Sequence, residues 1–145
     1  MTDRAVNHAT FTHERTYPAA PARVFAAWAD PDTKRRWLGA GDDYELSFEI
    51  GGHETVQASH EGKKITWHTT YVEIVPSERI VYTATLHFDD TLATASITTV
   101  ELTSSGDSTT VVLTEHGAYL DGHELPEWRE EGTATQLDNL TEEFS

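Results

Sequence analysis

The feature that most limits the fold of this chain is a series of short alternating segments between Tyr44 and Tyr119. Apolar and polar residues alternate in most of them, as in strands with one buried face. The connections are short and rich in glycine, aspartate and serine, which favours hairpins. Strands joined by hairpins run antiparallel, so the pattern predicts one antiparallel sheet. Together with an earlier segment, the expected strands are residues 11–17, 44–50, 53–60, 65–75, 79–89, 92–103 and 109–119.

Three other segments have helical spacing. Pro21 can occupy the first position of a short helix over residues 22–29, because its missing N–H needs no partner there. A second short helix is expected over residues 33–38, with Asp32 as its N-cap. A longer helix over residues 125–144 is only moderately apolar, so it needs a partner surface to be stable. Its expected packing stripe consists of Trp128, Leu137, Leu140 and Phe144.

These elements predict an α+β domain in which a curved antiparallel sheet of six or seven strands wraps around the C-terminal helix. The two short helices follow the first strand. No linker or repeat divides the chain, and its length fits one domain. We expect residues 1–9 to form a disordered extension and residues 10–145 to form the domain.

The composition argues against several classes of partner. A formal charge of −15 repels phosphate backbones and anionic lipids, so we expect neither nucleic acid nor a membrane surface as a partner. The chain has no cysteine, and no stretch approaches the roughly 18 apolar residues of a membrane-spanning helix. Its first residues also lack the pattern of a secretory signal, which favours the cytoplasm. A monomer and a homodimer both remain open.

The eight histidines do not form a metal-binding motif. The chain contains no His-Glu-x-x-His sequence and no cysteine pair, and its histidines fall on different expected strands and turns. A glycine-rich phosphate loop, a dinucleotide fingerprint and a Gly-x-Ser-x-Gly elbow are also missing. We therefore expect no metal and no cofactor.

The hairpin between segments 65–75 and 79–89 decides which side chains share the inner face of the sheet. That face includes Tyr82, and a buried phenol needs a hydrogen-bond partner. Pairing Val75 with Ile80 places one set of residues beside Tyr82, and a slip of one residue replaces the whole set. We favour the first set, Trp67, Thr69, Tyr71 and Glu73, over the second, His68, Thr70 and Val72.

Glu115 is the most unusual residue of the last expected strand. It shares a face with Val111 and Leu113, so its carboxylate is expected to point inward. An ionised carboxylate that faces an apolar interior is costly unless it is paired. Glu115 is therefore a candidate acid, base or ligand anchor, and the alternative is that it is solvated at the open end of the strand.

Five short motifs follow one another in a defined order. They are PARVFAAW at 21–28 with Asp30, Pro31 and Trp37, FEIGG at 48–52, YVEIVPSERIVYT at 71–83, TTVVLTE at 109–115, and EG at 131–132 with LDNL at 137–140. In this order they resemble the START/polyketide-cyclase superfamily, and within it the branch named after the activator of heat-shock-protein-90 ATPase. The resemblance covers about residues 10–145. It implies the helix-grip fold, with a cavity between the sheet and the C-terminal helix.

The chain departs from this family pattern at three positions. Ala84 stands where the family often has an aromatic residue, and Thr133 stands where it commonly has a tryptophan. Both residues are smaller, which implies a roomier cavity. Glu49 replaces a frequently basic residue, so an anion-binding role at that position does not carry over to this chain.

Three functions fit these features. The first is binding of a small hydrophobic molecule, aromatic or lipid-like, in the cavity. The second is a cyclase, dehydratase or hydrolase in which Glu115, Tyr71 or Tyr82 transfers a proton, and the third is a chaperone-associated protein-interaction module. We favour the first because no motif specifies an acid–base pair. The residues expected to line the ligand site are Trp67, Tyr71, Tyr82, Ala84, Leu86, Glu115, Thr133 and Leu137.

Overall fold

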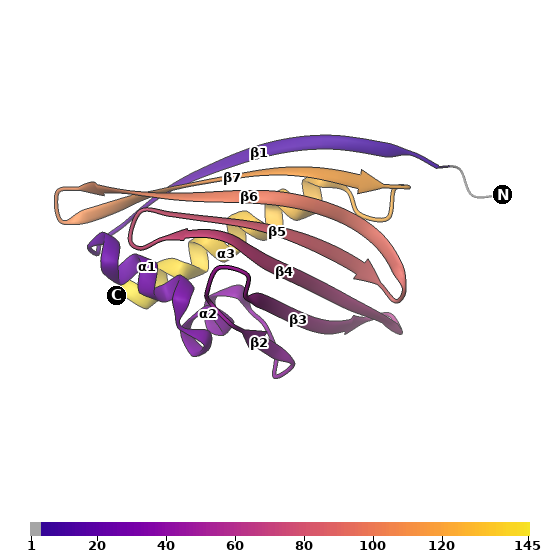
Figure 1. The fold of residues 1–145 in the computed structure, drawn as a ribbon, viewed down its shortest axis with the longest axis horizontal. Coiled ribbons are helices and arrows are strands. Elements are labelled where there is room, and N and C mark those ends of the chain that lie inside the picture. Colours follow the sequence, from indigo (N-terminus) through magenta and orange to yellow (C-terminus); the bar gives the residue numbers. More distant parts are fainter. Residues whose placement is uncertain (1–3) are drawn as a thin grey trace.

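Seven antiparallel strands form one curved sheet in the computed structural model, which describes residues 4–145, and a long helix lies along the inner face of the sheet (Figure 1). This arrangement is the predicted helix-grip fold. The strands are β1 (Val6–Tyr17), β2 (Tyr44–Leu46), β3 (His53–His60), β4 (Lys63–Val75), β5 (Arg79–Phe88), β6 (Thr91–Ser105) and β7 (Ser108–Leu120), in the spatial order β1-β7-β6-β5-β4-β3-β2. The helices are α1 (Pro21–Ala29), α2 (Pro31–Leu38), α3 (Pro126–Leu140) and the short 3₁₀ helix η1 (Thr141–Phe144).

The first strand is longer than the side-chain pattern predicted. It begins at Val6, which pairs with Leu120 of β7, so the expected disorder of residues 1–9 is wrong for residues 6–9. Residues 1–3 lie outside the described residues. The reason for the difference is that backbone hydrogen bonds to β7, rather than burial of apolar side chains, support this part of the strand. Ala5 adds a hydrogen bond from its N–H to Oδ1 of Asp121, at 2.8 Å.

The second strand is shorter than expected, since β2 ends at Leu46 and a tight loop replaces the predicted residues 47–50. At Gly52 an added Cβ would lie 2.1 Å from the carbonyl oxygen of Ser47, so the loop closes only around a glycine. Phe48 still packs inward and meets the ring of Tyr71 edge to face at 5.0 Å. Ile50, by contrast, is 65% exposed.

The hairpin of β4 and β5 contains a bulge that the alternation of apolar and polar residues does not predict. Val75 pairs with Arg79 rather than with Ile80, and the register shifts between Tyr71 and Glu73. Beyond the bulge, Tyr71 pairs with Tyr82, so Trp67, Thr69 and Tyr71 do lie on the inner face as predicted. Glu73 does not, because the extra residue of a bulge changes the face to which the following residues point. Its side chain is 43% exposed and forms an ion pair with Arg79.

The two short helices form where they were expected, with Pro21 and Pro31 in their first turns. Asp30, not the predicted Asp32, caps α2, because its side chain accepts a hydrogen bond from the N–H of Thr33 at 3.0 Å. Trp37 is 4% exposed, and its indole N–H donates to the carbonyl oxygen of Ala27 at 2.9 Å. This residue therefore anchors α2 on α1.

Helix α3 faces the sheet with a stripe that differs from the expected one. Leu137 and Leu140 are buried, and Phe144 is buried in η1, but Trp128 is 59% exposed. Arg129 replaces Trp128 in the inward stripe, since it is separated by helical spacing from Gly132, Thr133, Gln136 and Leu137. Within residues 4–145, no helix combines the length and the apolar character needed to cross a membrane.

Candidate functional site

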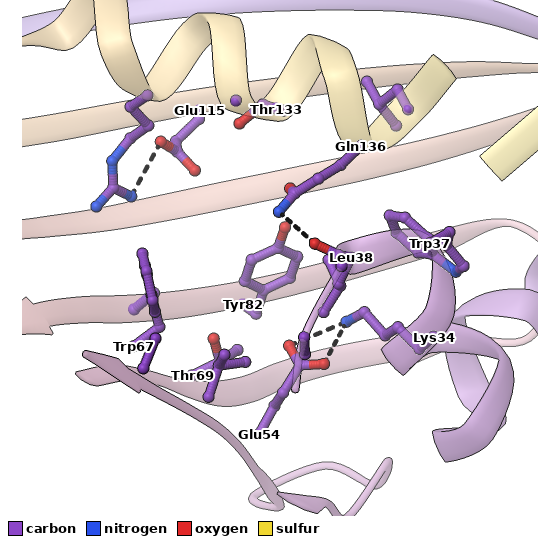
Figure 2. A pocket seen from close by; sticks show the side chains of 18 of the residues that line it. Lys34, Trp37, Leu38, Glu54, Trp67, Thr69, Tyr82, Glu115, Thr133 and Gln136 are labelled. Carbon is purple, nitrogen blue, oxygen red and sulfur yellow. Dashed lines mark hydrogen bonds and ion pairs between the residues drawn. The ribbon is translucent and has the colours of Figure 1, made fainter. Parts of the chain in front are cut away.

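A cavity of about 370 Å³ lies between the inner face of the sheet and the helices α2 and α3 (Figure 2). Strands β3, β4, β5 and β7 contribute its floor, and the loop of residues 39–41 closes one side. The apolar part of the wall is mainly aromatic and aliphatic, and exposed Trp128 also belongs to the lining. The apolar lining residues include Trp28, Trp37, Leu38, Val56, Trp67, Ala84, Trp128 and Leu137.

Six of the eight residues expected at the site line this cavity: Trp67, Tyr82, Ala84, Glu115, Thr133 and Leu137. The other two do not line it. Tyr71 is 1% exposed and lies behind Tyr82, with ring centroids 5.8 Å apart. Leu86 is also 1% exposed and takes part in packing beside Trp67, its partner on β4.

A buried ion pair occupies one wall of the cavity. Nζ of Lys34 on α2 lies 3.0 Å and 2.9 Å from the two carboxylate oxygens of Glu54 on β3, and it also donates to the Tyr71 hydroxyl at 2.8 Å. The Tyr44 hydroxyl donates to the same carboxylate at 2.6 Å. Burial, together with the Glu54 carboxylate, raises the pKa of both Tyr44 and Tyr71 above its ordinary value. Both phenols therefore remain protonated donors.

A second network lies at the N-terminal end of α3. Arg129 contacts Oε2 of Glu115 at 3.3 Å and Oε1 of Glu124 at 3.0 Å. Glu115 also accepts a hydrogen bond from the Thr98 hydroxyl at 2.8 Å, so its predicted inward position is confirmed and its carboxylate is paired. Burial alone would lower the pKa of the Arg129 guanidinium, but Glu115 and Glu124 outweigh it and the pKa is raised.

Between the two networks, polar groups face the cavity without an intramolecular partner. The hydroxyls of Tyr82 and Thr69 form no hydrogen bond within residues 4–145, although Thr69 is only 7% exposed. Every fully buried side-chain nitrogen or oxygen in the described chain has a partner, so these two hydroxyls open onto the cavity. Figure 2 shows both side chains directed from the sheet toward α3. Burial raises the pKa of Tyr82, which keeps its hydroxyl protonated.

Lys34, Glu54 and Arg129 are not among the predicted site residues, although the positions of the first two in the sequence indicate that they point inward. Lys34 lies three residues before Trp37 and therefore on the same buried face of α2. Glu54 lies two residues before Val56, on the inward face of β3. Opposite charges at inward positions on different elements indicate a buried pair. Within residues 4–145, no three histidine or carboxylate side chains are grouped closely enough to hold a metal ion.

Comparison with solved structures gives close matches. A putative uncharacterized protein from Rhizobium leguminosarum is 36% identical, with a TM-score of 0.93 over 99% of this chain and 98% of that one. The Mll3558 protein from Rhizobium loti is 44% identical, with a TM-score of 0.89 over 96% of this chain and 99% of that one. Ara h 8.0201 shares the fold at 16% identity, with a TM-score of 0.72 over 95% of each chain. No curated protein sequence matches the chain significantly.

The family comparison agrees with the motifs and with the fold. The model of the family described as activator of Hsp90 ATPase homolog 1-like protein matches residues 18–145. This range includes the two short helices, strands β2 to β7 and the gripped helix α3. The chain therefore belongs to the activator of Hsp90 ATPase homolog 1-like family.

Proposed function

We propose that this protein binds a small, mostly apolar molecule in the cavity between the sheet and α3. The observation that carries the proposal is the cavity itself, about 370 Å³, whose wall includes several aromatic and aliphatic side chains and a few unpartnered polar groups. Sites for small molecules commonly have volumes of roughly 300–1,000 Å³ and this mixture of apolar and polar lining. Ala84 and Thr133 both line the space, where larger side chains would reduce it.

Binding is favoured over proton-transfer catalysis because the carboxylates that line the cavity are already engaged. Glu54 is paired with Lys34, while Glu115 and Glu124 share Arg129. A general acid or base must be free to approach the substrate, and its pKa must suit the reaction. The unpartnered polar groups include the hydroxyls of Tyr82 and Thr69, which position a ligand well but are weak proton acceptors.

The test uses prodan, an uncharged naphthalene dye whose emission shifts to the blue in apolar surroundings. We expect saturable binding to the wild-type protein and a higher thermal midpoint, since a ligand at about 100 times its Kd stabilises the native state by roughly 2.7 kcal/mol. Ala84→Trp and Thr133→Trp should fill the space and abolish binding. Their matched controls are Thr83→Trp and Thr135→Trp, at exposed positions outside the cavity lining on the same strand and the same helix.

Circular dichroism of all four variants must show an intact fold for the comparison to hold. Equal prodan affinity in the cavity-filling variants and in their controls would place the dye elsewhere and contradict the proposal. Native mass spectrometry of protein purified from its own source offers an independent measurement. A copurified small molecule that Ala84→Trp displaces would support the same site.

A further inference from the structure

Building on the proposed function, we infer that the cavity selects uncharged ligands with a hydrogen-bond acceptor, to which the hydroxyl of Tyr82 or of Thr69 donates, and that it excludes carboxylates. The expected ligands are therefore neutral ring compounds that carry a carbonyl or ether oxygen, rather than apolar molecules in general. This selectivity rests on two separate features of the lining. These features are the balance of charged side chains and the position of the free hydroxyls.

Both cations in the cavity wall, Lys34 and Arg129, are already paired with carboxylates, so neither is free to bind an anionic ligand. Three carboxylates line the cavity, those of Glu54, Glu115 and Glu124, against two cations, Lys34 and Arg129. The Lys34 ammonium donates to Oε1 of Glu54 and to the Tyr71 hydroxyl, and it also lies 2.9 Å from Oε2 of Glu54, so its charge is already paired. The guanidinium of Arg129 contacts both of its carboxylates and the Ser96 hydroxyl.

A carboxylate that enters this space would lose its hydration without gaining a partner. Its desolvation is costly unless a charged or hydrogen-bonded partner replaces the water. The excess of one carboxylate in the wall adds repulsion, and the low polarity of the surroundings strengthens that repulsion. Fatty acids and aromatic acids are therefore poor ligands, although the apolar volume alone would accept them.

The two residues with free hydroxyls, Tyr82 and Thr69, are neighbours of Ala84, whose small side chain leaves space in the cavity. Thr69 is the partner of Ala84 on β4, and Tyr82 lies two residues before Ala84 on β5, so all three share the inner face. Tyr82 and Thr69 are diagonal neighbours, roughly 7 Å apart along the sheet. A ring over Ala84 would lie beside both residues. An acceptor oxygen on that ring can accept a hydrogen bond from one of these hydroxyls, which the protein itself leaves unused.

The test compares three probes of nearly the same shape: methyl β-naphthyl ketone, β-naphthoate and β-isopropenylnaphthalene. The first carries an acceptor, the second carries a negative charge, and the third carries neither. We expect the ketone to bind roughly 3- to 10-fold more tightly than the hydrocarbon, which is the usual effect of one hydrogen bond. We expect the naphthoate to bind at least about 10-fold more weakly than the ketone. Titration calorimetry or displacement of prodan measures all three affinities.

Three variants connect these differences to named residues. Tyr82→Phe should weaken ketone binding by roughly 3- to 10-fold and leave the hydrocarbon unchanged. Tyr119→Phe is the matched control, because this tyrosine lies on the neighbouring part of the sheet but does not line the cavity. Glu124→Gln removes the excess carboxylate and partly frees Arg129, so it should improve naphthoate binding by about 10-fold without affecting the ketone.

The outcomes separate this inference from the proposed function. If the naphthoate binds as tightly as the ketone, or if Tyr82→Phe and Tyr119→Phe behave alike, the inference is overturned while ligand binding stands. If none of the probes binds and prodan is also inert, the proposed function itself fails. The inference is supported only when the ketone binds best and both the Tyr82 and the Glu124 variants shift affinity in the stated directions.

Discussion

Two residues of opposite charge, Lys34 on α2 and Glu54 on β3, are buried against each other. Lys34 is 3% exposed and Glu54 is 6% exposed, values that are unusual for these residue types. Their burial is tolerated because the ammonium and carboxylate pair directly, and because Tyr44 and Tyr71 supply further hydrogen bonds. Such a pair contributes to the position of α2 over β3 rather than to a large net gain in stability. Removal of one partner alone should therefore be far more damaging than removal of both charges.

We predict that Lys34→Met destabilises the protein by about 3–5 kcal/mol, because it leaves the Glu54 carboxylate buried without its cation. The double variant Lys34→Met with Glu54→Gln should be more stable than the single variant, since no unpaired charge remains. Urea denaturation measures the free energy of unfolding for each. Arg36→Met on the exposed side of α2 is the control and should cost much less. A loss below about 1 kcal/mol for Lys34→Met would contradict the role of the pair.

At the scale of single elements, local sequence defines the faces of the helices and strands, but their packing defines which face is used. In α3 the residues that point inward include Arg129, Gly132 and Thr133, so the helix is held by an ion pair at one end and by Leu137 and Leu140 toward the other. Glycine in the middle of a helix costs conformational entropy. Gly132 faces the open cavity, so no protein atom lies within 4 Å of a Cβ added there.

Two glycine-to-alanine substitutions separate an open position from a closed one. At Gly132 no atom lies within 4 Å of an added Cβ, so Gly132→Ala should stabilise the protein by about 0.5–1 kcal/mol. At Gly117 on β7 the added Cβ would lie 2.8 Å from Cε1 of the buried Tyr119 ring, so Gly117→Ala should destabilise it by about 1–3 kcal/mol. Thermal and urea unfolding measure both effects. The same sign for both substitutions would refute this description of their surroundings.

At the scale of the whole molecule, contacts between β1 and the C-terminal helices hold α3 against the sheet. The Tyr17 hydroxyl at the end of β1 donates to the carbonyl oxygen of Leu137 in α3 at 2.7 Å. Arg15 pairs with Asp138, and the ring of Phe144 lies 5.5 Å from that of Tyr17. These contacts join segments more than one hundred residues apart in sequence, so they form only when sheet and helix are both in place.

Alkaline pH should destabilise the whole fold. All five tyrosines have a raised pKa, chiefly because burial disfavours the phenolate, and for Tyr119 burial raises the pKa to about 12. Above pH 10 the unfolded chain loses these protons before the native state does. The native state then binds more protons than the unfolded state, so the free energy of unfolding falls as pH rises. This contribution is fully present below about pH 10 and is lost as the pH rises through the folded pKa values.

Urea denaturation at a series of pH values from neutral to strongly alkaline measures this dependence. Tyrosinate absorbance recorded in parallel should appear together with unfolding rather than before it. Tyr119→Phe removes one of the five groups and should give a shallower loss of stability with pH. Complete tyrosine ionisation near pH 10, with the circular dichroism of the fold unchanged, would disprove the prediction.

The sequence by itself predicted the elements and much of the cavity. Alternation and helical spacing are local patterns, so they indicated the antiparallel sheet, the two short helices and the inward faces of Tyr82, Ala84 and Glu115. The family motifs added the helix-grip topology, which the structure and the family comparison confirm. Element type and the periodicity of apolar residues follow from neighbouring residues, and a single sequence contains that information.

Only the tertiary structure decided which side chains meet. The bulge after Tyr71 turns Glu73 outward, and the placement of α2 brings Lys34 onto Glu54. The rotation of α3 puts Arg129 inside and leaves Trp128 exposed at the cavity. A periodic pattern defines a face to within about one residue, which for a helix corresponds to a rotation of roughly 100°. An error of one residue therefore exchanges buried Arg129 for exposed Trp128. Only the contacts of α3 with the sheet decide which of the two points inward.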